Sequence, residues 1–166
     1  MPNRSLDVLY PPFRAQIEIL LGKLSVAKLP FFPFMTLRTL EEQDALYAQG
    51  RTVPGKIVTN APGGMSFHNY CLAIDLVPDI AIPGKPGLQW SWETKNADFN
   101  KDGRNDWLQM AELAVSCGLE AGYFWKKFPD LPHVQNRYGL TINEAREIYR
   151  QHNGDIKAVW AECKAA

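Results

Sequence analysis

Apolar residues recur at the spacing of an amphipathic helix in two parts of the chain. The pattern predicts one helix over residues 12–24 and another from Trp107 to a stop at Gly118. Each helix therefore has one apolar face that can be buried in a core. The apolar positions that define the two helices are Phe13, Ile17, Leu20, Leu21 and Leu24 in the first, and Trp107, Met110, Ala111, Ala114 and Cys117 in the second.

Two capping boxes predict where shorter helices begin. In a capping box a Thr side chain and a Glu three residues later satisfy each other's backbone amides at the helix start. Thr39 and Glu42 form the first box, at the start of a helix that stops at Gly50. Thr141 and Glu144 form the second, at the start of two short helices in the C-terminal part of the chain.

Short apolar runs bounded by Gly, Pro and Asn predict strands at residues 57–59, 72–77 and 133–135. Side chains alternate between the two faces of a strand, so Ala73 and Asp75 share one face of the second strand. The apolar residues between them take the other face. The strand therefore presents Asp75 to a cleft while its opposite side faces the core.

The composition is that of an ordinary globular domain. The 166 residues are 46% hydrophobic and 22% charged, which argues against intrinsic disorder and fits a single domain with a short helical extension at about residues 138–166. Lys plus Arg and Asp plus Glu number 18 each, so no net field draws the chain to nucleic acid or to a membrane surface. We expect neither as a partner, and we expect a monomer.

Two stretches that lie far apart in the sequence look like the two halves of one zinc site. Residues 66–75 supply His68 and Asp75, and residues 130–133 supply His133 and a further carboxylate, Asp130. Catalytic zinc sites use three protein ligands and leave a fourth position open for water. His68, Asp75 and His133 match that ligand count. Asp130, three residues before His133, is placed to act as a general base, although it could instead only cap the turn before Pro132.

These stretches form the pattern Ser-x-His-x-x-x-x-Ala-x-Asp followed by Asp-x-Pro-His. The pattern resembles the zinc D,D-carboxypeptidase and L-alanyl-D-glutamate endopeptidase family, which includes many phage endolysins. The resemblance extends in order over roughly residues 30 to 136. It departs from the family at Cys71, where glycine is usual, and at residues 121–124, where a Trp-Gly-Gly-Asp-like stretch is usual. The other segments that resemble the family are residues 37–43, 46–52, 54–55, 118–120 and 125–128.

The resemblance implies an α+β fold of the Hedgehog/D,D-peptidase-like type, with a small antiparallel sheet, packed helices and a zinc cleft on the sheet face. It implies a zinc-dependent peptidase that acts on peptidoglycan stem peptides, with the L-alanyl-D-glutamate bond as the predicted target of a phage-type endolysin. D-alanyl-D-alanine carboxypeptidase needs the same centre and is the nearest alternative. A non-catalytic wall-binding or virion structural protein on the same fold is the other, although it would need neither Asp130 nor Arg38.

Several further residues near these motifs could have either a functional or a structural role. Arg38 precedes a helix start, where a cation opposes the helix dipole, and the resemblance implies that it binds the developing oxyanion. Gln43 is expected to point inward from that helix. Gln43 and Ser66 are candidate substrate contacts, although each could instead satisfy a backbone group. Trp125 and Phe128 are expected in the core. The thiol of Cys71 is expected to be a small apolar filler rather than a ligand.

The N-terminal residues and the cysteines indicate the cellular compartment in which the protein is made. The first residues lack a basic segment followed by a long apolar run, so no export signal is expected. The three cysteines, Cys71, Cys117 and Cys163, fit reduced thiols. We therefore expect synthesis in the host cytoplasm without a signal peptide, and action on the cell wall after release.

A long irregular stretch over residues 79–106 contains a candidate calcium loop. Its glycine, Gly103, occupies position six, as in a calcium loop. Position twelve is Gln109 rather than the usual bidentate Glu, which would weaken binding. Asp106 and Gln109 could instead serve only as a cap for the helix that follows. The candidate ligands at positions one, three, five, seven and nine are Asp98, Asn100, Asp102, Arg104 through its carbonyl, and Asp106.

Overall fold

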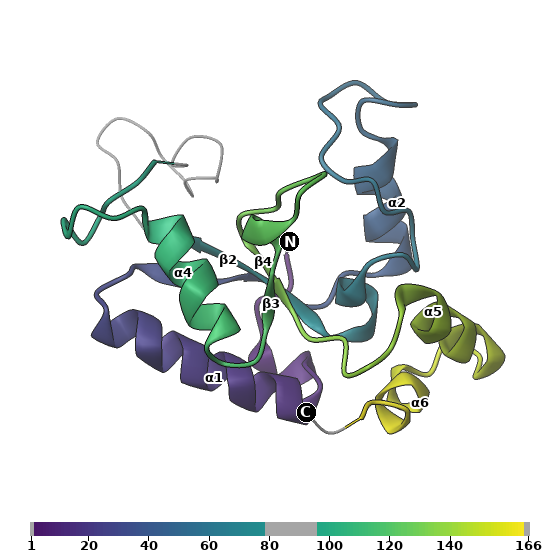
Figure 1. Ribbon diagram of the computed structural model, residues 1–166. Coiled ribbons are helices and arrows are strands. Elements are labelled where there is room, and N and C mark those ends of the chain that lie inside the picture. The colour runs from purple at the N-terminus through teal and green to yellow at the C-terminus, as the bar shows by residue number, and fades with distance from the viewer. Residues whose placement is uncertain (1, 79–95, 165–166) are drawn as a thin grey trace.

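Four short antiparallel strands form the sheet on which the rest of the chain is built. The structure is a computed structural model that describes residues 2–78 and 96–164. The strand order is β1-β2-β4-β3. Helices flank the sheet, so the predicted α+β class is confirmed (Figure 1). Within the described ranges no helix combines the length and apolar character needed to span a bilayer. The strand bounds are Phe31–Met35 for β1, Ala73–Pro78 for β2, Glu120–Ala121 for β3 and His133–Gln135 for β4.

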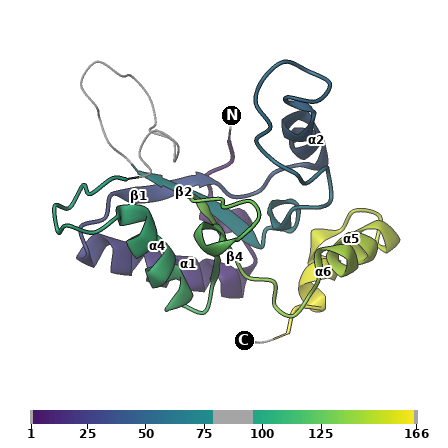
Figure 2. The ribbon, with the colours of Figure 1, turned by 45° about the horizontal axis from the view of Figure 1, so that its top comes forward.

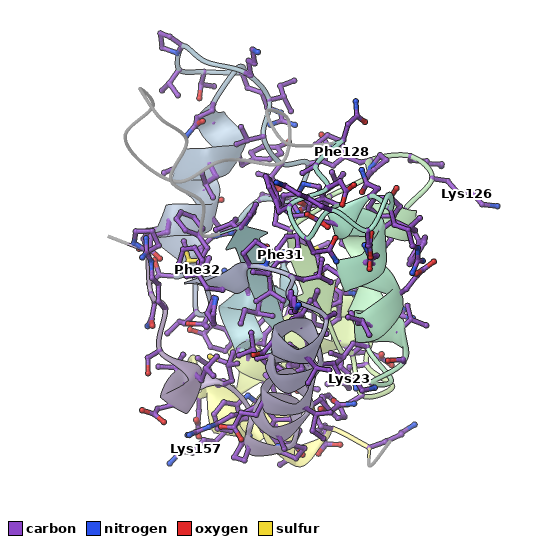
Figure 3. All side chains as sticks on the ribbon, turned by 90° about the vertical axis from the view of Figure 1, so that its left-hand side faces the viewer. Lys23, Phe31, Phe32, Lys126, Phe128 and Lys157 are labelled. Carbon is purple, nitrogen blue, oxygen red and sulfur yellow. The ribbon has the colours of Figure 1, made fainter. Side chains whose placement is uncertain are left out.

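Helices α1 and α4 lie together on one side of the sheet (Figures 1 and 2). Helix α1, Pro11–Val26, begins with proline at its first position, where the missing amide costs nothing. Helix α4, Asp106–Val115, ends before Gly118, which has the positive φ of a helix stop. Both predicted helices are thus confirmed. Their apolar faces meet in one core that also includes Phe31 of β1, whose ring lies 4.9 Å from that of Trp107. In Figure 3 Phe31 lies inside the molecule.

Helix α2, Leu40–Ala48, lies across the strands from α1 (Figure 2). The predicted capping box is present, because the Thr39 hydroxyl accepts from the Glu42 amide and the Glu42 carboxylate accepts from the Thr39 amide. The chain then turns at Gly50, where φ is 70°. The box fixes the start of α2, and with it the position of the residue before it, Arg38.

The C-terminal part of the chain forms two short helices, as predicted. They are α5, Ile142–Gln151, which starts with the predicted capping box, and α6, Ile156–Ala161. The indole of Trp160 donates a 2.9 Å hydrogen bond to the carbonyl of Tyr70. Ala145 and Val159 belong to the same apolar cluster as the residues beneath the sheet. The tail therefore packs on the segment that carries His68.

The predicted strand at residues 57–59 is wrong. The structure gives this segment no strand pairing, and the side chains of Ile57 and Val58 are exposed. The nearest pairing is an isolated bridge between Gln49 and Val53. An apolar run becomes a strand only when a neighbouring strand is available for its backbone groups, and no strand of the described residues pairs with this one. Much of the long irregular stretch, residues 79–95, lies outside the described residues.

Candidate functional site

Three side chains predicted as zinc ligands converge at one point above the sheet. His68 Nε2 lies 3.1 Å from Asp75 Oδ1, and His133 Nδ1 lies 3.4 Å from the same oxygen. One nitrogen or oxygen atom of each residue lies within 4.8 Å of the other two. Among the residues that the structure describes, no other three of the His, Cys, Asp and Glu types meet in this way. The structure therefore brings together both halves of the predicted cluster.

Strand pairing and a short helix bring the three side chains of the cluster together. Asp75 on β2 and His133 on β4 are directly opposite partners in the antiparallel pairing, so their side chains share one face. This confirms the predicted alternation along β2, with Ile74 buried on the other face. His68 comes from the short 3-10 helix η2, Phe67–Tyr70, whose N-cap residue Ser66 accepts a hydrogen bond from the His68 amide.

Hydrogen bonds behind the two histidines fix which nitrogen of each ring faces the cluster. His68 Nδ1 lies 2.8 Å from the carbonyl oxygen of Thr36, which can only accept, so a proton on Nδ1 leaves the Nε2 lone pair, 3.1 Å from Asp75, available to a cation. His133 Nε2 lies 2.9 Å from Gln135 Oε1, so a proton on Nε2 leaves the Nδ1 lone pair, 3.4 Å from Asp75, available to a cation. Metal-binding histidines characteristically donate their other N–H to such an acceptor. Two neutral imidazoles and a carboxylate therefore fit a divalent cation such as zinc.

The pKa values of the three cluster residues are shifted in different directions. Burial works to raise the pKa of Asp75, but the charge of His68, hydrogen bonds from both histidines and the charge of Arg38 hold it well below its usual range. Burial lowers the pKa of His68. For His133 the hydrogen bond to Asp75 and the nearby carboxylates outweigh burial, so its pKa is raised. Asp75 is therefore the anion around which the site is organised.

Arg38 supports this anion from the side of α2. Its Nη2 lies 3.0 Å from Asp75 Oδ2, and its Nη1 donates a 2.9 Å hydrogen bond to Gln43 Oε1. The Gln43 amide in turn donates to the carbonyl of Ala61 at 2.7 Å. Gln43 is fully buried, which confirms that it points inward. A direct contact between Gln43 and substrate does not agree with this position, because every observed bond of its side chain is internal and none of it reaches solvent.

Asp130 is the carboxylate in excess of the three-residue cluster. It lies on the segment before β4 and faces the same cavity as His68 and His133. No hydrogen bond from the described residues reaches its carboxylate. Burial, together with the negative charge of Asp75, raises the pKa of Asp130 to about 6. A carboxylate with such a pKa can exchange a proton near neutral pH.

A cavity of about 700 Å³ opens in front of the cluster. Arg38 and Ser66 lie on its wall, so the structure places both at the candidate site. Most of the remaining wall is apolar and comes from the segments around β1, α2 and the loop before β4. A volume of this size is typical of a ligand-binding cleft. The apolar lining residues are Phe34, Met35, Leu46, Val58, Ala61, Met65, Phe67, Trp125, Phe128, Pro132 and Ile142.

The expectation that Trp125 and Phe128 belong to the core is wrong. Their exposed fractions are 37% and 39%, and both line the cavity. The Trp125 ring centroid lies 5.0 Å from that of His133. In Figure 3, Phe128 lies at the same end of the molecule as Lys126, which projects into solvent. Large aromatic side chains favour a core on average, but this exposed loop leaves them facing the candidate site.

Cys71 is buried and ends η2 in the left-handed conformation, with φ at 59°. That conformation suits the glycine usual in the family at this position, because a Cβ is disfavoured there. Burial raises the pKa of the Cys71 thiol to about 12, so it stays neutral. The thiol lies outside the three-residue cluster, in agreement with its expected role as an apolar filler.

Gly122 allows the backbone of Asp130 to pack closely against residue 122, beside His133. A Cβ at this position would lie 2.5 Å from the carbonyl oxygen of Asp130 and 3.1 Å from the Cβ of His133. We expect Gly122→Ala to destabilise the fold by about 1–3 kcal/mol, because the Asp130 backbone must shift. Denaturant unfolding checks this, with Gly22→Ala as the matched control, since nothing lies within 4 Å of that position. Equal stability of the two variants would show that the loop has room to move.

In the candidate calcium loop, backbone amides donate hydrogen bonds to the carboxylate of the loop's first residue. The amides of Asp102 and Gly103 each donate 3.0 Å hydrogen bonds to the carboxylate of Asp98. Asp106 instead accepts from the Phe99 amide, and the preceding residue, Asn105, is the N-cap of α4. Calcium binding by Asp98, Asn100, Asp102, Arg104 and Asp106 stays a prediction.

Part of the chain is similar in sequence to known proteins. Residues 59–136 match a family model described as D-alanyl-D-alanine carboxypeptidase. The chain is 48% identical over 99 residues to the peptidoglycan L-alanyl-D-glutamate endopeptidase CwlK of Bacillus subtilis (strain 168), a match that covers 59% of this chain and 55% of that protein. The chain thus spans about half the length of this curated relative. The resemblance inferred from the two motifs is confirmed.

A solved structure supports the fold. The L-Ala D-Glu endopeptidase ChiX of Serratia marcescens superposes with a TM-score of 0.51 at 22% sequence identity, covering 92% of each chain. At that identity the likeness concerns the fold alone. It covers a larger share of the chain than the family match over residues 59–136 does.

Proposed function

We propose that this chain is a zinc metallopeptidase that hydrolyses peptidoglycan stem peptides at the L-alanyl-D-glutamate bond. The observation that carries the proposal is the cluster of His68, Asp75 and His133, with a surplus carboxylate, Asp130, facing the same cavity. The 48% identity to CwlK over 99 residues supports the peptidoglycan substrate. In this proposal the chain is an endolysin of phage type, which is made in the host cytoplasm and acts on the cell wall after its release.

Zinc held by His68 Nε2, Asp75 and His133 Nδ1 would supply Lewis acidity toward the scissile carbonyl and its attacking water. Asp130 takes the proton of that water and later returns it to the leaving amine. Arg38 is always charged, and on the cavity wall it stabilises negative charge that develops on the carbonyl oxygen. Its ion pair with Asp75 also holds that carboxylate in a fixed orientation. Ser66 on the same wall is a candidate substrate contact.

The charges of the cavity wall favour an endopeptidase over a carboxypeptidase. Among the described residues that line the cavity, Arg38 is the only Lys or Arg, and it is already paired with Asp75. A carboxypeptidase must bind the terminal carboxylate of its substrate, which a free cation does best. D-alanyl-D-alanine carboxypeptidase is the second candidate, favoured by the description of the matching family model.

Amidation of a stem peptide's C-terminus separates these two activities. An endopeptidase has no need of a free terminal carboxylate, so we expect equal kcat/KM for the amidated and free peptides. Chromatography of the digests measures both rates in one assay. Selective loss of the amidated substrate would assign the chain to the carboxypeptidases.

The pKa of Asp130 predicts the acid side of the pH profile. A general base works only when it is ionised. Because the pKa of Asp130 is raised to about 6, protonation and loss of activity on acidification begin closer to neutral pH than for an ordinary aspartate. A cation beside Asp130 favours the ionised form and lowers this value. We therefore expect kcat/KM to fall through a limb at or below about pH 6, above the ordinary range of an aspartate. An identical limb in the residual activity of Asp130→Asn would assign it to another group.

A further inference from the structure

Gln135 lies directly behind His133 on the same face of the sheet. It follows His133 by two positions on β4, so the two side chains point the same way. In the pairing of β3 with β4, its partner across the ladder is Glu120. Gln135 is buried, with an exposed fraction of 7%.

The bonds of Gln135 leave only one arrangement of its amide. Its Nε2 donates a 3.0 Å hydrogen bond to Glu120 Oε2. The other oxygen of Glu120 accepts a 2.6 Å bond from Arg137 Nε, which holds the carboxylate in place. An ionised carboxylate can only accept, so the amide nitrogen must face Glu120 and the amide oxygen must face His133.

That orientation decides where His133 carries its proton. An amide oxygen can only accept, so His133 Nε2, at 2.9 Å, must be the donor. The other acceptor within reach of the ring is Asp75, which lies 3.4 Å from Nδ1. Two acceptors thus compete for the single proton of a neutral imidazole. If Asp75 gained it, the nitrogen that faces the cluster would lose its lone pair.

We propose that Gln135, oriented by Glu120, is a positioning residue that keeps the proton of His133 on Nε2 and so presents Nδ1 to the cation. This inference rests on the proposed role of His133 as a zinc ligand. Gln135 also lines the cavity, but in this proposal it acts on the cation site through His133. Outer-shell partners of this kind typically change metal affinity by about 10- to 100-fold when removed.

Two measurements on Gln135→Leu test the proposal without using activity. In the metal-free protein at alkaline pH, long-range ¹H–¹⁵N NMR reads the tautomer of each ring, and the chain has only three histidines to assign. We expect the Nε2–H form of His133 in the unsubstituted protein and the Nδ1–H form in Gln135→Leu, because Asp75 is then the remaining acceptor. Competition with a chromogenic chelator should show zinc binding weakened by about 10- to 100-fold.

A reciprocal exchange and a matched control complete the design. The double variant Gln135→Glu with Glu120→Gln keeps an acceptor against His133 and a donor between the strands, so we expect it to restore both the Nε2–H form and the zinc affinity. Gln151→Leu removes a Gln that donates to Glu147 on exposed α5, and it should change neither. The Nε2–H form and undiminished zinc affinity in folded Gln135→Leu would overturn the proposal. Failure of the proposed peptidase activity would be visible separately, as tight zinc binding without cleavage.

Discussion

Replacing Asp130 with asparagine is expected to lower turnover by about two to four orders of magnitude while zinc stays bound. The amide has nearly the shape of the carboxylate but cannot take a proton from water. Asp130 lies outside the three-residue cluster, so its loss removes no ligand. Burial already disfavours its charge, and a neutral side chain there should leave the fold at least as stable.

Zinc content and muropeptide cleavage measured on the same sample check this prediction. Asp7→Asn is the matched control, because Asp7 is exposed and, among the described residues, its carboxylate pairs only with Arg14. Loss of zinc together with activity would place Asp130 among the ligands. Full activity with zinc retained would remove it from the mechanism.

Alanine at His68 or at His133 is expected to abolish both zinc binding and cleavage. Each substitution removes one of three ligands, so the loss in zinc affinity should exceed the roughly 100-fold upper range for outer-shell partners. Each also removes an imidazole whose ring nitrogen lies within 3.4 Å of the Asp75 carboxylate, so the metal-free variants should be less stable than the metal-free parent.

His152→Ala provides the control. His152 is exposed at the C-terminal end of α5, away from the cluster, and its replacement should change neither property. Zinc affinity is read by chelator competition and stability by denaturant unfolding. Undiminished zinc binding in a folded His68→Ala or His133→Ala variant would show that the cation lies elsewhere.

Local rules in the sequence predicted much of what positions the site. The capping box at Thr39 fixed the start of α2 and therefore the place of Arg38. Alternation along β2 predicted the face on which Asp75 lies, and the pairing with His133 agrees with it. These features depend on neighbours within a few residues, which is why the chain's own pattern reveals them.

Features that depend on distant partners were not predictable in the same way. The segment at residues 57–59 has the composition of a strand but no partner beside it, and Trp125 has the size of a core residue but faces the cavity. Gln135 was also missed. The available signal was its spacing of two from His133 on a predicted strand, which places both side chains on one face. Only the structure shows that Glu120 lies opposite and orients it.

Mass spectrometry of purified muropeptides after incubation with the zinc-loaded protein tests the proposed peptidase most directly, because the new termini identify the bond that is cut. We expect a new carboxyl terminus on L-alanine and a new amino terminus on D-glutamate. Verified removal of the metal should stop the reaction, and added zinc should restore it. Intact muropeptides after incubation with folded, zinc-loaded protein, or cleavage that continues in the metal-free protein, would contradict the proposal.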